Sequence, residues 1–128
     1  MTQFEQQSVQ RNQKNFLWFL LAHLPVFALT AWYFRTGALT GVLIGAAVVA
    51  GPCILYRLWP GSSIVSMAIG AAVMCLSGVL IHLGRGMIEM HFHVFAGMAF
   101  LVWLADFRAV VVAAVPIAMH HLLFFFWL

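Results

Sequence analysis

The sequence predicts an all-α integral membrane protein, a bundle of five transmembrane helices. Of its 128 residues, 65% are hydrophobic and only 7% are charged. A soluble domain of this size could not bury so much apolar surface. The few charged side chains fall in short clusters, and the intervals between these clusters are close to one membrane crossing long. This spacing is expected when charges are tolerated only at the edges of a bilayer.

Five apolar segments follow a polar stretch at residues 1–15, which we interpret as a cytoplasmic N-terminal tail. Each segment has about 18–20 residues, enough at about 1.5 Å per residue to cross a hydrocarbon core of about 30 Å. The connections are short, so consecutive helices are expected to be antiparallel neighbours. Residues 16–128 therefore form one helical bundle, with expected spans at 16–35, 39–57, 63–83, 87–105 and 109–128.

Lysine and arginine residues predict the orientation of the bundle, because cytoplasmic loops are enriched in them. A cytoplasmic N-terminus leaves Arg35 and Arg85 outside and places four cations inside: Arg11, Lys14, Arg57 and Arg108. The excess favours this orientation. The last span ends without a charge, and we expect a sixth span in a full-length chain.

Composition also argues against two kinds of function. The net charge of +3 is small and dispersed, which argues against nucleic-acid binding. Cys53 and Cys75 lie in separate apolar segments without a Cys-x-x-Cys spacing, so neither a disulfide framework nor a thiolate metal site is expected.

Gly41 and Gly45 form a G-x-x-x-G pair that predicts close helix packing. The alternative is that such glycines leave room for a flat cofactor or a partner subunit.

Six histidines carry the main chemical signal. All lie within or at the ends of predicted spans: His23, His82, His91, His93, His120 and His121. A membrane anchor that used them only for packing would need a partner for each, because unpaired buried polar groups are costly. Neutral imidazole is the commonest metal ligand, and ionisable side chains inside membranes are by default functional candidates.

Helix geometry arranges these side chains in two tiers. A rise of about 1.5 Å per residue predicts a tier near the midplane (His23, His93, His120, His121) and another near the outer surface (His82, Glu89, His91). Glu89 and His93 are four residues apart and share a helix face, so the carboxylate could orient the imidazole or join it as a ligand. His91 points roughly opposite to His93, since two residues advance a helix by about 200°. The two histidines are therefore expected to have different partners.

Two cofactors fit this pattern, and the residues leave the choice open. A transition-metal ion (copper, zinc or iron) would use imidazole and carboxylate ligands, for which the candidates are His82, Glu89, His91, His93 and His120. Haem b needs axial histidines in an apolar slot beside small residues, for which the candidates are His23, His93, His120 and His121.

The segment IHLGRGMIEMHFHVFAGMAFLVWLADFRAVVVAAVPIAMHHLL resembles a known family. It is similar to the multi-span membrane sensor region found N-terminal in bacterial methyl-accepting chemotaxis proteins, diguanylate cyclases and sensor histidine kinases. That family carries an H-L-x-x-G-x-I-E-x-H-F-H core, a short turn and a later His-His pair. The matching positions are His82, Gly86, Ile88, Glu89, His91, Phe92, His93, Asp106, His120 and His121, with His23 and Pro25 matching the first span. Arg85 stands where the family often has a small residue.

The resemblance implies a signal-input domain in the bacterial inner membrane rather than an enzyme. It implies a homodimer with a cytoplasmic signalling module in the full-length chain, and the buried histidines would hold the metal or haem that senses a ligand or redox state. One alternative is a histidine-based proton or ion pathway. Another is an integral-membrane metalloenzyme, although the His-x-x-x-His and His-x-x-His-His spacings typical of membrane desaturases are absent.

Overall fold

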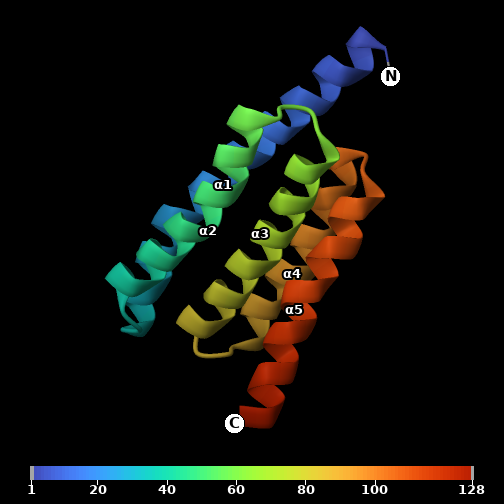
Figure 1. Cartoon of the computed structure of the whole chain (residues 1–128). Coiled ribbons are helices and arrows are strands. Elements are labelled where there is room, and N and C mark those ends of the chain that lie inside the picture. Colours follow the sequence, from blue (N-terminus) through green and yellow to red (C-terminus); the bar gives the residue numbers. More distant parts are fainter. Residues whose placement is uncertain (1, 128) are drawn as a thin grey trace.

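The computed structural model describes residues 2–127 and is a bundle of α-helices (Figure 1). The helices are α1 (Gln3–Phe34), α2 (Ala38–Leu58), α3 (Ser63–Leu83), α4 (Ile88–Leu101) and α5 (Phe107–Trp127). A short 3-10 helix, η1 (Val102–Leu104), follows α4. No β-strand occurs in these residues, so the all-α prediction with five main helices is confirmed.

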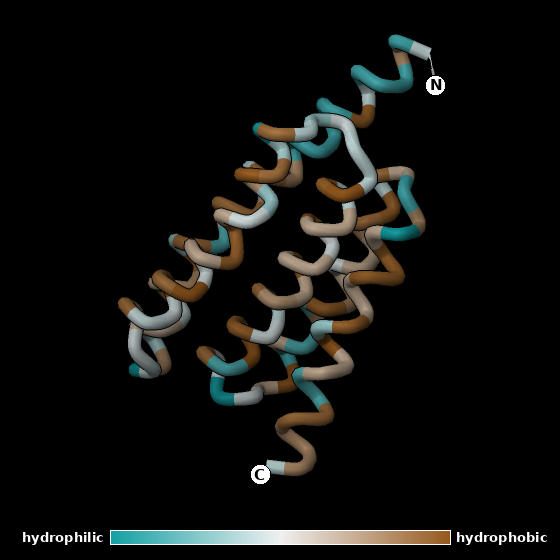
Figure 2. Tube along the Cα trace, viewed as in Figure 1, coloured by the Kyte–Doolittle hydropathy of each residue, from teal (hydrophilic) through white to brown (hydrophobic). Residues whose placement is uncertain are grey.

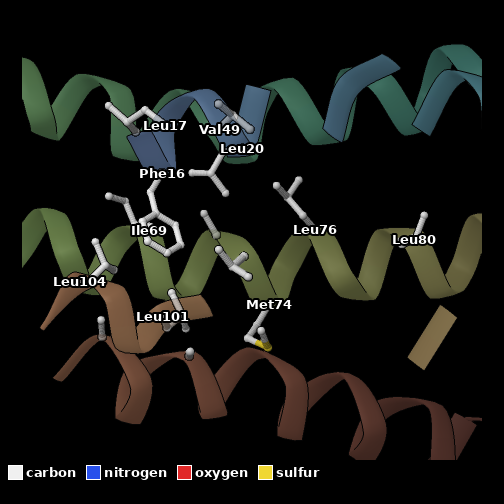
Figure 3. Close-up of a cluster of buried hydrophobic side chains, with 14 of the residues drawn as sticks. Phe16, Leu17, Leu20, Val49, Ile69, Met74, Leu76, Leu80, Leu101 and Leu104 are labelled. Atoms are coloured by element: carbon white, nitrogen blue, oxygen red, sulfur yellow. The ribbon is translucent and has the colours of Figure 1, made fainter. Parts of the chain in front are cut away.

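Helix α3 lies at the centre of the bundle. It packs against α1 and α2 on one side and against α4 and α5 on the other (Figure 1). Most of its residues are buried, whereas α5 buries only Ala109 and Ala113. Figure 3 shows the resulting core, in which Phe16 and Leu20 of α1 meet Ile69 of α3. The core is therefore organised around one helix that touches all the others.

Four of the helices, α1, α2, α3 and α5, are long and apolar enough to cross a membrane. The expected span at 87–105 instead consists of α4 and η1, which together form a shorter apolar helix, Ile88–Leu104. Ala105 ends it with a φ of 53°, a left-handed conformation that a regular α-helix cannot continue. The fourth segment therefore stops just before the predicted boundary.

The outer surface of the bundle is apolar. Figure 2 shows hydrophobic residues along the helices and hydrophilic ones gathered at the N-terminal part of α1 and at the turns. Large side chains such as Leu39 and Ile88 are 74% and 81% exposed. Soluble monomers rarely expose contiguous apolar patches larger than a few hundred Å². The exposed apolar residues and the four long helices together indicate a membrane protein.

Glycines allow the helices to approach closely, as the G-x-x-x-G pair predicts. A Cβ atom added at Gly41 would lie 2.8 Å from Leu83 of α3, and one at Gly45 would lie 2.9 Å from the Phe27 ring of α1. Both glycines therefore pack against neighbouring helices, and Gly41 also lines a cavity between α2, α3 and α5. Close packing of this kind replaces the hydrophobic driving force, which is weak between helices in lipid.

The N-terminal stretch is helical, because α1 begins at Gln3 and runs without a break into the first apolar segment. Within it, Gln13 is completely buried. Its Nε2 donates to the Ser62 carbonyl and the Ser66 hydroxyl at 3.0 Å each, and its Oε1 accepts from the Gly61 N–H at 2.8 Å. This one side chain fastens α1 to the turn between α2 and α3.

Replacing Gln13 by leucine is expected to destabilise the bundle by about 1–3 kcal/mol, because buried partners lose their hydrogen bonds. Thermal unfolding in detergent, followed by circular dichroism, measures the change. Gln7→Leu is the matched control, since Gln7 is an exposed residue of the same helix. An equal effect of the two substitutions would contradict the anchoring role of Gln13.

Candidate functional site

Two of the six histidines meet in the interior of the bundle. His23 of α1 and His93 of α4 place their Nε2 atoms 2.8 Å apart, with the rings perpendicular. His23 is only 5% exposed, and His93 is partly buried. We call these two residues the histidine pair. It joins two helices that are far apart in the sequence.

The histidine pair is part of a longer hydrogen-bonded chain. His23 Nδ1 lies 2.8 Å from the Phe19 carbonyl, and His93 Nδ1 lies 2.8 Å from the Ser77 hydroxyl of α3. A carbonyl only accepts, so His23 Nδ1–H donates to it and His23 Nε2 accepts from His93 Nε2–H. His93 Nδ1 can then only accept, and the single hydrogen of the Ser77 hydroxyl serves either this nitrogen or the Val73 carbonyl, each 2.8 Å from Ser77 Oγ. Neutral imidazoles thus satisfy one another and link α1, α4 and α3.

The predicted partnership of Glu89 with His93 is not formed. Both ring nitrogens of His93 already have partners, His23 and Ser77. Glu89 lies one turn earlier in α4 and is exposed. Glu89 lies in the first turn of α4, where the positive end of the helix dipole favours a carboxylate.

The other four histidines line a single cavity of about 590 Å³. His82 comes from α3, His91 from α4, and His120 and His121 from α5. We call them the histidine quartet. The ring centroids of His91 and His121 are 5.8 Å apart, and those of His120 and His121 are 5.5 Å apart. The structure therefore divides the histidines differently from the two predicted tiers, because His120 and His121 join His82 and His91.

Two members of the quartet are held with a free Nε2 atom. His91 Nδ1 lies 3.1 Å from the Met87 carbonyl, and His121 Nδ1 lies 2.8 Å from the Ile117 carbonyl. Because the carbonyls only accept, each neutral ring carries its hydrogen on Nδ1 and keeps a lone pair on Nε2. Histidines that bind metals typically donate their second N–H to a backbone carbonyl in the same way. The donor chemistry of the quartet thus fits a metal ion.

The spacing of the quartet comes close to that of ligands sharing an ion. Two imidazoles on one tetrahedral ion, with metal–nitrogen distances of about 2.0–2.1 Å, have ring centroids about 5 Å apart. The observed separations of 5.5 and 5.8 Å are slightly wider. Within residues 2–127, no three His, Cys, Asp or Glu side chains stand close enough to hold an ion together. Binding would require these side chains to rotate into the cavity.

The predicted ligand sets are split between the two places. Of the metal candidates, His82, His91 and His120 line the quartet cavity, whereas His93 belongs to the histidine pair and Glu89 is exposed. The haem candidates are separated too, since His23 and His93 form the pair while His120 and His121 belong to the quartet.

A second cavity, of about 540 Å³, lies between α2, α3 and α5 and is mostly apolar. It shares His82 and His120 with the quartet cavity. His120 stands over Gly78 of α3, where an added Cβ would lie 3.3 Å from His120 Nδ1. Gly78 therefore makes room for this imidazole, which faces both cavities.

Two further residues belong to these sites. Ser77 was not predicted from the sequence, and Arg85 was noted there without a role in a site. Ser77 completes the hydrogen-bonded chain of the histidine pair, and Arg85 lines the quartet cavity. A serine within an apolar helix commonly bonds the carbonyl four residues earlier, so its place in the sequence does not indicate a contact with a histidine of another helix.

Comparison of the chain with family models, curated proteins and solved structures gives no match. The resemblance to membrane sensor regions remains a prediction.

Proposed function

We propose that this chain is the sensory transmembrane domain of a bacterial signalling protein, and that the histidine quartet holds a transition-metal ion. The observation that carries the proposal is that His91 and His121 each keep a free Nε2 atom in a cavity that His82 and His120 also line. The similarity of the His/Glu core to chemotaxis-type receptors supports the sensory role. The domain would lie in the cytoplasmic membrane with its N-terminus inside.

Metal binding would act on helix packing. The quartet joins α3, α4 and α5 at one end of the bundle, so an ion would tie three helices together. An ion that binds one packing of these helices more tightly than another shifts the population toward it. In a homodimer with a cytoplasmic module, that shift would reach the output domain.

The metal ion is favoured over haem because of the tautomers of His91 and His121. Copper, zinc and iron all accept imidazole ligands, and two of the quartet rings already present Nε2 lone pairs. Haem b remains the second candidate because His120 also faces the larger apolar surface of the second cavity. An absorption spectrum separates the two, since only haem gives a Soret band.

The test is metal binding by the purified chain. The protein is loaded with Cu, Zn or Fe, freed of excess metal and analysed for elements; about one ion per chain is expected. His91→Ala and His121→Ala should each weaken metal binding by roughly 10- to 100-fold or more. Loss of a residue that only supports a metal ligand already costs about that much.

His23→Gln is the matched control, because it alters a histidine of the same protein outside the quartet. It should leave the metal content unchanged. Absence of metal from the wild-type chain, or equal losses from His23→Gln and His121→Ala, would contradict the proposal. A Soret band that disappears in His120→Ala would replace the ion by haem.

A further inference from the structure

Arg85 lines the same cavity as the histidine quartet. It lies in the turn between α3 and α4, where it has a φ of 56° and is followed by Gly86 at 73°. The chain has three acidic residues, Glu5, Glu89 and Asp106. None of them lines this cavity. The guanidinium therefore has no carboxylate among the lining residues to balance its charge.

The cavity thus combines two groups with opposite requirements. The Nε2 lone pairs of His91 and His121 accept a cation, as their bonds to backbone carbonyls determine. The Arg85 guanidinium has five N–H donors and no acceptor, so it pairs with an anion. A metal ion alone would add positive charge beside Arg85, and an anion alone would face the imidazole lone pairs. A metal ion that carries an anionic ligand satisfies both.

We infer that the quartet cavity binds a small carboxylate anion, held jointly by the quartet metal ion and by Arg85. This inference rests on the proposed metal site and names the class of ligand that it senses. The planar guanidinium matches the two oxygens of a carboxylate, and carboxylate oxygen is a common ligand of such ions. A cavity of about 590 Å³ lies within the range of small-molecule sites.

The chain offers a matched control for Arg85. Arg35 is also an exposed arginine in a turn, with a φ of 55°. Its turn joins α1 and α2 at the same end of the bundle, since the Thr36 hydroxyl donates to the Leu83 carbonyl at 2.8 Å. Arg35 does not line the quartet cavity. A comparison of the two arginines therefore separates a local contact from the general effect of charge.

The experiment titrates acetate into the full chain loaded with Cu²⁺ and follows the ligand-field absorption of the metal. Acetate should produce a saturable shift in wild type. Arg85→Gln should weaken acetate binding by about tenfold or more, as expected for loss of a charge-assisted hydrogen-bonded partner, with metal content unchanged. Arg85→Lys, which keeps the charge but loses the planar fork, should be intermediate, and Arg35→Gln should match wild type.

The outcomes separate the two proposals. If the chain binds copper but acetate causes no shift, or if Arg85→Gln and Arg35→Gln weaken binding equally, the carboxylate inference is overturned while the metal site stands. Loss of the metal itself from Arg85→Gln would also overturn it, because Arg85 would then act on the ion rather than on the anion. If the wild-type chain binds no metal, the proposed function fails first and the inference fails with it.

Discussion

Replacing Gly70 by alanine is expected to force α3 and α5 apart. A Cβ atom at this position would collide with the backbone carbonyl of Ala109. A backbone carbonyl cannot rotate away as a side chain can, so the two helices must separate or the chain must deform. Overpacking of a well-packed contact costs about 1–3 kcal/mol and occasionally more. Because α5 carries His120 and His121, the quartet should also bind metal more weakly.

The measurement compares the thermal unfolding midpoint and the metal affinity of Gly70→Ala with those of Gly51→Ala. Gly51 lies within α2, and an added Cβ there would meet nothing within 4 Å. Alanine is favoured over glycine in a helix by up to about 1 kcal/mol, so Gly51→Ala should be neutral or stabilising. Equal unfolding midpoints for the two variants would show that the α3–α5 contact at Gly70 is not tightly packed.

The helices were largely predictable because their signal is local. Apolar segments of membrane-spanning length, separated by turns such as Trp59 to Ser62, predict where α2 and α3 begin and end. The fourth segment also ends within one residue of its predicted boundary, but it does so through a 3-10 turn and a left-handed Ala105. The sequence has no proline or glycine at that point, so this manner of ending could not be predicted from residue type.

The site was predictable in direction but not in grouping. The helical twist correctly predicted that His91 and His93 face different neighbours, which are His121 and His23. The estimate of depth gave height along the helices but not position around the bundle. His120 has a height similar to that of His93, yet it sits on α5, on the far side of α3 from α1. Only the packing order of the helices assigns it to the quartet.

Replacing His93 by alanine is expected to weaken the bundle through loss of the histidine pair. The substitution leaves His23 Nε2 without its partner in the interior, whereas the Ser77 hydroxyl keeps its bond to the Val73 carbonyl. A buried polar group that loses its partner costs about 1–3 kcal/mol. His23 has its other nitrogen bonded to its own helix, so the bond to His93 is its link to another helix. The loss should appear as a lower unfolding midpoint in detergent.

A double-mutant cycle isolates the contact between the two imidazoles. The free energy of unfolding is measured for His23→Ala, His93→Ala and the double variant, and residues in one hydrogen-bond network typically show coupling of about 0.5–3 kcal/mol. His82→Ala is the control partner, since His82 is exposed at the end of α3 and belongs to the quartet. Its cycle with His23→Ala should be additive. If the effects of His23→Ala and His93→Ala on the free energy of unfolding were additive, each imidazole could be replaced independently of the other. The 2.8 Å contact between them would then contribute nothing to holding α1 and α4 together.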